Sequence, residues 1–519
     1  MRSATPWLRS PGGPRRSIPP LLLLLLWSVA ADSMAQPLKR EPLPGISHST
    51  GRAAITSLGR DLMAILSDRN LSDATWGISI VSCDNGEPLF RYNDGRNRQV
   101  ASNIKLLTTA TALYRLGGDY RYTTDLYVGG GVAPNGELRG NVVIHTSGDP
   151  SISPSFGVDP REMIRGWAAA LDSAGIESVQ DIIVDASDFD NVPYAPGWAW
   201  DDEPYGFNAQ ISAAAIYDNS IEVTVTPGKT PGAPVSIDIS PSTAYVTLKV
   251  TAVTSRNDST ATIDIRRERN GSMIVVTGNI AAGAEPYVDH ISIEKPPLFF
   301  ATLVKEEFER LGITVHGETF DMEEYPEHIS YTPLRRLAAH TSPPMREIVS
   351  ATNKQSLNLA AEMLTKKLGR IYGGIGSTAA GVETIRKMLG ESGVDIEHIK
   401  IYDGSGLSRQ DMIAPADITT LLRWAWRSSV ARDFMGSLAV AGKDGTLINR
   451  LRGTLAEGNV IGKTGYLNSI RAISGYARTR DGELVAFSIV ANNYSVPTSV
   501  VNTAQDLIVM RLASFSRKS

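Results

Sequence analysis

The segment from Val100 to Gly118 constrains the fold of this chain more than any other stretch. A helix that is apolar nearly all the way round is buried, so this one should run through the core of a domain. Gly117 and Gly118 form the stop signal expected past its last turn. We therefore predict a single buried helix that begins at Val100. The side chains that give it more than one buried face are Ile104, Leu106, Leu107, Ala110, Thr111 and Leu113.

Two polar residues, Ser102 and Lys105, interrupt this pattern in the first turn. Residues three apart on a helix lie on one face, so the hydroxyl and the amine can reach each other. A serine becomes a good nucleophile when a base takes its proton, and a lysine with a lowered pKa can be that base. The pattern also fits a helix-terminal serine beside a lysine that extends to solvent. The rest of the chain must decide between these two interpretations.

The chain has 519 residues, which favours two or three domains. A content of 42% hydrophobic and 20% charged residues is typical of a soluble globular protein. The net charge of −4, with scattered Lys and Arg, argues against a nucleic-acid-binding surface. Cys83 is the only cysteine, so no intrachain disulfide can form. We expect this thiol to be buried as a small hydrophobic group.

The first 35 residues have the features of a secretory signal peptide. Four arginines within the first sixteen residues precede a short apolar run, Leu21–Trp27. The small residues of Ser33-Met34-Ala35 then suit a cleavage site. The apolar run is short for a membrane-spanning helix, although an uncleaved anchor is the alternative. We predict export from the cytoplasm, a cleaved signal peptide over 1–35 and a linker over 36–50.

The remaining chain alternates between helical and strand-like patterns. A hairpin near the start (75–92) and another near the end (470–491) can share one sheet, and 119–329 would then loop out as a β-rich insertion of one or two subdomains. Further strand patterns cover 122–148, 181–295 and 460–464. Helical patterns cover 53–66, 160–173, 298–311, 345–351, 357–368, 379–389, 415–426, 431–437 and 496–515.

Three short motifs occur in a specific order. They are Ser102-Asn-Ile-Lys105, Ser356-Leu-Asn358 and Lys463-Thr464-Gly465. The first opens the buried helix, the second precedes a helix, and the third lies on a strand that enters the last hairpin. Each motif alone is weak, but this order and context are typical of penicillin-binding proteins and serine β-lactamases.

Further stretches make the resemblance specific. The chain resembles the class C low-molecular-mass penicillin-binding proteins, the D-alanyl-D-alanine carboxypeptidase/endopeptidase family, over about residues 50–510. The resemblance implies an α/β (α+β) fold: a serine β-lactamase/DD-peptidase-like domain, with an antiparallel sheet flanked by helices, formed by 51–118 and 330–519 around the insertion. The additional similar stretches are Leu116–Thr124, Gly140-Asn141, Gly148–Pro150, Pro196–Asp202, Asp403–Ser408 and Asp444–Leu447.

The resemblance also implies roles for the catalytic residues. Ser102 would attack the carbonyl between two D-alanines and form an acyl-enzyme, with Lys105 as the base. Lys463 would help to keep Lys105 neutral by like-charge repulsion and could hold the substrate carboxylate. Ser356 would relay a proton to the leaving amine. The backbone N–H groups of Ser102 and Tyr466 would form the oxyanion hole.

The resemblance implies that the second and third motifs bind the substrate. By the same resemblance, Asn358 would hydrogen-bond the substrate amide, and Thr464 would hydrogen-bond the terminal carboxylate next to Gly465. Two residues depart from the family pattern. Leu357 stands where a polar residue is common, and Tyr466 replaces a small residue and could narrow the cleft. Neither substitution removes a catalytic group, so we expect an active enzyme.

The implied partners are peptidoglycan peptides and β-lactam antibiotics in the periplasm, with no nucleic acid, no cofactor and no metal; a homodimer remains open. The seven histidines are scattered, without a His-Glu-x-x-His motif. A second function remains open as well: a non-catalytic cell-wall-binding protein or β-lactam receptor that retains the fold. A β-lactamase is a third candidate, but no motif assigns a base for rapid deacylation.

Several other residues have simpler interpretations. Tyr122, Trp198 and Trp200 could stack on glycans, but packing in the core or in loops is the commoner role of such aromatics. We expect Asp201-Asp202-Glu203 to be a solvated acidic loop rather than a cation site. Gly404-Ser405-Gly406 lacks the Gly-x-Ser-x-Gly pattern of a Ser-His-Asp hydrolase, so we expect a loop turn there.

Overall fold

The computed structural model describes residues 48–257 and 259–518. The predicted signal peptide and most of the predicted linker lie outside these residues. The first three residues of helix α1 (His48–Leu66) fall within the predicted linker, which ends at residue 50. No helix in the described ranges is long and apolar enough to cross a membrane.

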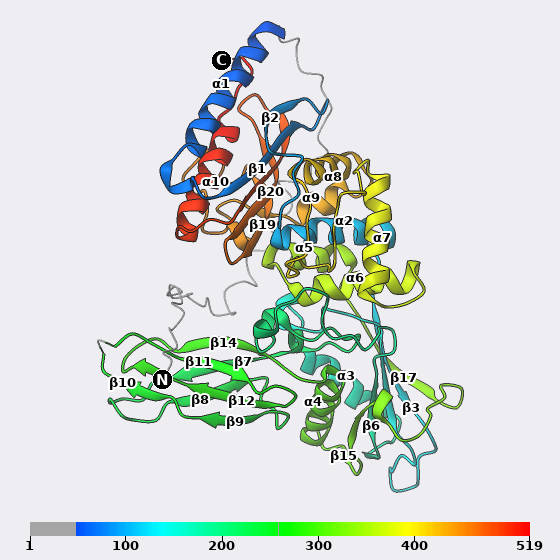
Figure 1. Ribbon diagram of the computed structural model, residues 1–519. Helices are drawn as coiled ribbons and strands as arrows, with labels where there is room; N and C mark the ends of the chain where they lie inside the picture. The colour runs from blue at the N-terminus through cyan, green and yellow to red at the C-terminus, as the bar shows by residue number, and fades with distance from the viewer. Residues whose placement is uncertain (1–47, 258, 519) are drawn as a thin grey trace, which may run out of the picture. The chain divides into compact units, whose positions relative to one another are not determined.

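A six-stranded antiparallel sheet joins the two ends of the described chain (Figure 1). The first and last hairpins meet at the pair of β1 and β21, where Ile78 lies opposite Ile489. The prediction that the first and last hairpins share a sheet is therefore confirmed. The strands, in their order across the sheet, are β18 (Ala439–Val440), β19 (Ile461–Leu467), β20 (Ile470–Arg478), β21 (Leu484–Asn492), β1 (Thr75–Ser82) and β2 (Pro88–Tyr92).

Helices cover both faces of this sheet. Because side chains alternate along a strand, Phe487 of β21 packs with the α1 side of the sheet while its neighbour Ala486 packs with the opposite side. Figure 1 shows α1 lying beside α10 (Thr498–Ala513), and Leu58 and Ile508 share their core with Phe487. The helices of the other face are α2 (Ile104–Leu116), α5 (Met345–Gln355), α6 (Asn358–Tyr372), α7 (Thr378–Glu391), α8 (Pro415–Arg427) and α9 (Ala431–Gly436).

The buried helix predicted from Val100 is present, but its first turn is different. A 3₁₀ turn spans Ala101–Asn103, and α2 itself begins at Ile104. Ala101 has φ +47°, which an α-helix cannot contain, so the prediction of one continuous helix was wrong at this end. The helix is otherwise buried as expected, and it ends at Gly117, which has φ +90°.

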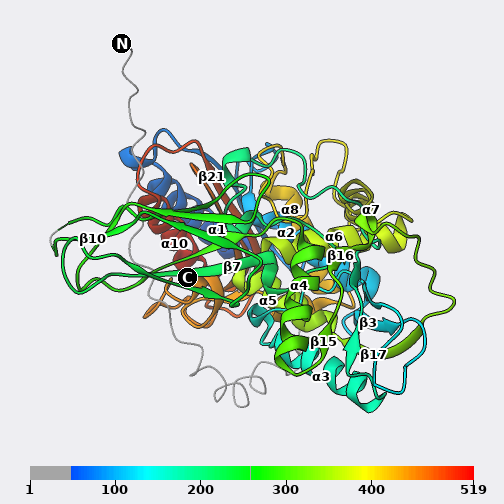
Figure 2. The ribbon, with the colours of Figure 1, turned by 90° about the horizontal axis from the view of Figure 1, so that it is seen from below.

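The region after α2 forms a second sheet with five strands. Two helices pack against it, and Trp167 of α3 (Pro160–Ser173) stacks near Phe300 of α4 (Pro296–Arg310), with ring centroids 6.4 Å apart. Figures 1 and 2 both show these two helices side by side. In order across the sheet, the strands are β16 (Thr319–Asp321), β6 (Ile182–Asp185), β4 (Val142–Thr146), β3 (Thr123–Val128) and β17 (Arg335–Thr341).

The position of β17 extends this region beyond the boundary predicted at residue 329. The strand runs antiparallel to β3, with Ala338 opposite Leu126. The chain therefore completes the edge of the second sheet before it returns to α5. A local strand pattern does not indicate which sheet the strand joins, because tertiary contacts alone set the pairing of β17 with β3.

The rest of the inserted region consists of smaller sheets. Their buried residues, such as Ile221 and Ile274, belong to the same core as those of the five-stranded sheet. The strands are β5 (Ser178–Val179) with β15 (Thr314–Val315), β7 (Ser220–Thr226) with β8 (Ser236–Ser240) and β14 (Tyr287–Ser292), β9 (Thr247–Val250) with β12 (Met273–Thr277) and β11 (Asp264–Arg267), and β10 (Val253–Ser255) with β13 (Asn279–Ala281).

One loop of the inserted region packs directly on α6. Phe189 and Ile211 share a small apolar cluster with Leu359 and Met363 of that helix. Residues from the insertion therefore lie beside the Ser356–Asn358 motif, which the α5–α6 junction carries.

Candidate active site

The three sequence motifs meet at one place. The amine Nζ of Lys105 lies 3.1 Å from Ser102 Oγ and 2.6 Å from Asn358 Oδ1, so the first motif contacts the second. The amine of Lys463 lies 2.8 Å from Ser356 Oγ, so the third motif also contacts the second. The structure thus brings together side chains from α2, the α5–α6 junction and β19, which are far apart in the sequence.

Close backbone packing shapes the turn that carries Ser102. A Cβ atom at Gly465 of β19 would lie 2.3 Å from the carbonyl oxygen of Val100, and one at Gly406 would lie 2.0 Å from that of Ala101. Only glycine allows such approaches, so two separate segments press on the turn. The side chain of Asn103 also donates a hydrogen bond to Ser474 Oγ of β20 (2.6 Å). These contacts explain why the 3₁₀ turn replaces the predicted α-helical turn.

The second motif occupies a tight junction between two helices. Ser356 ends α5 with φ +64°, and Leu357 precedes α6 in an extended conformation. The backbone N–H of Leu357 donates to the carbonyl of Thr352, 3.1 Å away, and its side chain is half-buried. Leu357 therefore does not disturb the contact of Ser356 with Lys463 or that of Asn358 with Lys105.

Lys105 is fully buried. Burial lowers its pKa from 10.5 to about 7, and the negative charges of Asp403 and Glu362 oppose part of that shift. Its amine donates hydrogen bonds to Ser102, Asn358 and the carbonyl of Ser405, the last at 2.8 Å. A lysine with this pKa is substantially neutral near pH 7, which is what a general base requires.

Lys463 is the second fully buried lysine of the site. Burial lowers its pKa well below the usual value, and the positive charges of Lys105 and Arg471 lower it further. Its amine also donates to the backbone carbonyl of Thr464, at 2.9 Å, while the hydroxyl of that threonine donates to Thr446 Oγ1 at 2.8 Å. The amine is therefore held between β19 and the α5–α6 junction.

Tyr466 does not fill the site. Its side chain is 57% exposed, and the guanidinium of Arg471 lies 5.2 Å from the centre of its ring. The two residues are partners in the β19–β20 pairing, so the contact follows from the register.

Two buried carboxylates beside Lys105, Glu362 and Asp403, were not predicted from the sequence as site residues. Glu362 lies one helical turn after Asn358 on α6 and accepts hydrogen bonds from the backbone N–H groups of Gly404 (3.0 Å) and Ser405 (2.7 Å). Burial, reinforced by the charge of Asp403, raises the pKa of Glu362 to about 8. The four-residue spacing from Asn358 was the available signal, because it places both side chains on one helix face.

The second of these carboxylates, Asp403, organises the loop after it. It accepts hydrogen bonds from the backbone N–H groups of Gly406 and Ser408, both at 2.7 Å, and from the indole N–H of Trp198 at 2.9 Å. The predicted loop turn at 404–406 is present, but it is part of the site, since the Ser405 carbonyl holds Lys105.

The inserted region contacts the site through the segment that contains Phe207. The side-chain N–H of Asn358 donates to the backbone carbonyl of Phe207, 2.8 Å away. Tyr122 is in the core, as expected, whereas Trp200 is 73% exposed, with the guanidinium of Arg269 4.5 Å from its ring centre. Asn358 thus has one partner in the inserted region and one in the first motif.

The acidic stretch 201–203 is not simply a solvated loop. Glu203 is largely covered and lies 3.3 Å from the buried guanidinium of Arg267, so the expectation of full solvation was wrong for this residue. Buried carboxylates that persist are paired, which explains the difference. Across residues 48–257 and 259–518, no three His, Cys, Asp or Glu side chains gather in a way that could hold a metal ion.

Comparisons with known proteins show which family this chain belongs to. The family model described as the D-Ala-D-Ala carboxypeptidase 3 (S13) family matches residues 58–515. A D-alanyl-D-alanine carboxypeptidase from Actinomadura sp. (strain R39) is 34% identical, over 91% of this chain and 87% of that protein. The D-alanyl-D-alanine carboxypeptidase DacB of Haemophilus influenzae is 25% identical, over 85% of this chain and 93% of that protein.

Solved structures show the same fold. The crystal structure of penicillin binding protein 4 (dacB) from Haemophilus influenzae superposes with a TM-score of 0.76 at 23% identity, covering 89% of this chain and 99% of that one. The same protein has been solved in complex with a β-lactam, with a TM-score of 0.72 at 22% identity, covering 88% of this chain and 99% of that one. With the family match, these findings establish an α/β fold of the DD-peptidase type. The chain belongs to the D-Ala-D-Ala carboxypeptidase 3 (S13) family and is a serine-type D-alanyl-D-alanine carboxypeptidase.

Proposed function

We propose that Ser102 is the nucleophile of this carboxypeptidase and Lys105 its general base. One observation carries the assignment: the buried amine of Lys105, with a pKa of about 7, lies 3.1 Å from Ser102 Oγ. Among the serines of the chain, the family's motif order points to Ser102. The packing of Gly406 and Gly465 against the turn that carries Ser102 supports a fixed position for its side chain.

Acylation then follows from the chemistry of these groups. Neutral Lys105 takes the proton of Ser102 Oγ, and the oxygen attacks the carbonyl carbon between the two D-alanines. The backbone N–H groups of Ser102 and Tyr466 stabilise the negative oxygen of the tetrahedral intermediate. The C–N bond breaks as Ser356 passes its proton to the leaving amine, which departs as D-alanine, and the proton held by Lys105 replaces it on Ser356, so that both groups return to their starting state. Water then attacks the ester and regenerates Ser102.

Lys463 prepares this site in two ways. Its hydrogen bond to Ser356 Oγ supports a role in the proton relay to the leaving amine. Its position beside Thr464 supports binding of the substrate's terminal carboxylate by both residues. Asn358 binds the substrate amide, and the absence of a side chain at Gly465 lets β19 approach the nucleophile turn.

We also propose the wider setting of the reaction. The substrates are peptidoglycan stem peptides, with endopeptidase action on D-Ala-containing cross-links in addition to carboxypeptidase action, outside the cytoplasm. β-Lactams acylate the same serine; the crystal structure of the Haemophilus influenzae relative with a β-lactam supports this. The pairing of β17 with β3 supports a division into a catalytic domain (51–118 and 342–519) and an insertion (119–341).

The test is mass spectrometry of the protein after incubation with benzylpenicillin, alongside release of D-alanine from a D-Ala-D-Ala peptide. The adduct should lie on the peptide that contains Ser102, and S102A should lose both the adduct and turnover while keeping its circular dichroism spectrum. S429A, at an exposed serine, is the matched control and should behave as the parent. An adduct without peptide turnover would favour the non-catalytic receptor, and an adduct on another serine would refute the assignment.

A further inference from the structure

The side-chain amide of Asn358 is held from two sides. Its Oδ1 accepts from Lys105, and its Nδ2 donates to the backbone carbonyl of Phe207. A carbonyl can only accept a hydrogen bond, so it selects the NH₂ end of the amide and leaves the oxygen facing the lysine. The orientation of Asn358 therefore depends on where the chain near Phe207 lies.

The segment 203–210, which contains Phe207, lies along the edge strand β14 of the inserted region. The backbone N–H of Ser292 donates to the carbonyl of Pro204 at 2.9 Å, and its hydroxyl donates to that of Glu203 at 2.6 Å. Tyr205 forms an isolated bridge with Ile291. The inserted sheets thus fix the start of the segment that carries the Phe207 carbonyl.

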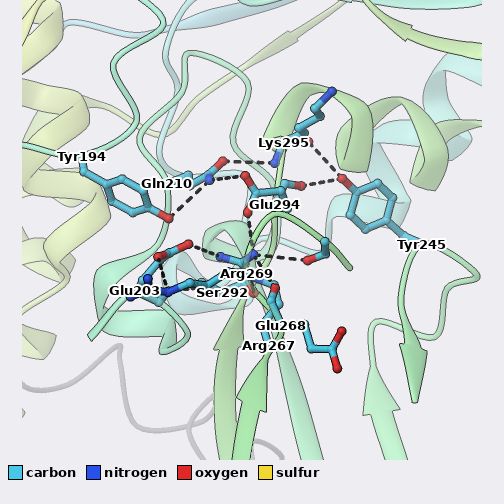
Figure 3. Close-up of polar contacts among 11 residues, drawn as sticks. Tyr194, Glu203, Gln210, Tyr245, Arg267, Glu268, Arg269, Ser292, Glu294 and Lys295 are labelled. Carbon is cyan, nitrogen blue, oxygen red and sulfur yellow. Dashed lines mark hydrogen bonds and ion pairs between the residues drawn. The ribbon is translucent and has the colours of Figure 1, made fainter. Parts of the chain in front are cut away.

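Arg267 ties both ends of this segment to the sheets (Figure 3). Its side chain is only 1% exposed, and its guanidinium lies 2.5 Å from Glu294 Oε2 and 3.3 Å from Glu203 Oε1. Glu294 in turn accepts from Gln210 Nε2 at 2.8 Å, at the far end of the segment. The guanidinium also donates to the backbone carbonyls of Ser292, Glu268 and Gly271.

We propose that Arg267 is a positioning residue for the peptidase reaction: it holds segment 203–210 so that the Phe207 carbonyl keeps Asn358 Oδ1 turned toward Lys105. Arg267 lies on β11 in the inserted sheets. It acts on segment 203–210 through Glu203, through Glu294, which holds Gln210, and through the carbonyl of Ser292. The inference rests on the proposed catalytic role of Lys105. Under this proposal the insertion has a function in catalysis, because it orients the side-chain amide of Asn358.

The primary variant is Arg267→Met, which keeps an apolar stem and removes the hydrogen bonds. It leaves Glu203 and Glu294 without their shared cation, so the segment should loosen. We expect kcat/KM for a D-Ala-D-Ala peptide to fall at least tenfold, and hydrogen exchange of backbone amides in 203–210 to accelerate. Arg266→Met is the matched control, because Arg266 is the exposed neighbour on the same strand, and it should change neither quantity.

The pH profile separates positioning from general destabilisation. If Asn358 turns its NH₂ toward Lys105, a donor faces the amine and disfavours its charged form, so the acid limb of kcat/KM should move to lower pH. The other charged groups around that amine, which the variant leaves in place, are Glu362 on α6, Asp403 in the loop before Gly404, and Lys463 on β19.

A milder variant keeps the test decisive if Arg267→Met folds poorly. Glu203→Gln retains a hydrogen-bond acceptor and leaves Arg267 paired with Glu294, so it should shift the same limb in the same direction by less. The proposal would be overturned if kcat/KM of the variants were unchanged. It would also be overturned if kcat/KM fell only in step with thermal stability while the acid limb of the pH profile stayed in place. A failure of the proposed catalytic roles would show separately, as a penicillin adduct away from Ser102 in the parent protein.

Discussion

The amine of Lys105 lies closer to Asn358 Oδ1, at 2.6 Å, than to Ser102 Oγ, at 3.1 Å. The amide therefore holds the lysine at the nucleophile from one side, and the Ser405 carbonyl holds it from another. Three hydrogen-bond acceptors fix the position of the Lys105 amine. Burial, in contrast, sets its protonation state, because it disfavours the charged form. The first two predictions test this division.

The peptidase reaction should depend on pH through Lys105. The lysine must be neutral to accept the serine proton, so kcat/KM should rise as pH increases through about 7, its pKa. Lys105→Arg keeps the charge but removes the base, and should lower the acylation rate by about 10²–10⁴-fold. Lys387→Arg, at an exposed position of α7, is the control. A parent profile that is flat between pH 5 and 9 would contradict the prediction.

Glu362→Gln should leave the acid limb of this profile where it is. The pKa of Glu362 is about 8, so its carboxyl is mostly neutral where Lys105 titrates, near pH 7, and its replacement removes little charge. The glutamine can still accept from the Gly404–Ser405 backbone, so the loop should stay in place. Glu383→Gln, on the exposed face of α7, should not alter the profile. A limb that moves to lower pH would contradict this, because it would show that Glu362 is charged over this range and raises the pKa of Lys105.

Two glycine substitutions should separate backbone strain from steric collision. Gly406 and Gly453 both have positive φ, at +82° and +70°. Alanine at Gly453 meets no atom within 4 Å, so it should cost only the roughly 1–2 kcal/mol of the left-handed conformation. Alanine at Gly406 would also meet the Ala101 carbonyl, so we expect a larger loss of stability to urea and a slower benzylpenicillin reaction. Equal losses would argue against the close packing behind Ser102.

Cys83 should be unreactive in the native protein. Its side chain is fully buried, and burial together with the nearby charge of Asp84 raises the pKa of the thiol to about 12. The thiolate is the reactive form, so a disulfide reagent at pH 8 should label the folded protein very slowly and the unfolded protein in guanidinium at once. Labelling within minutes under native conditions would show that this strand end opens readily.

Much of the fold could be predicted from local patterns. The range predicted for α3, residues 160–173, matches the structure, and the hairpin around Asp84-Asn85-Gly86 is present as expected. These features depend on contacts between neighbours in the chain, such as helix periodicity, capping residues and turn residues. The three motifs could be recognised for the same reason, because each is short and contiguous.

The sequence by itself determined the three motifs, their order and the residues that we propose carry the chemistry. Only the tertiary structure decided how they act together. The 3₁₀ turn at Ser102 comes from the approach of Gly406 and Gly465, and the low pKa of Lys105 comes from complete burial. The partner of Asn358 in the inserted region, the Phe207 carbonyl, has no local signature. Such effects arise between segments far apart in the chain, where desolvation and close packing depend on the whole fold.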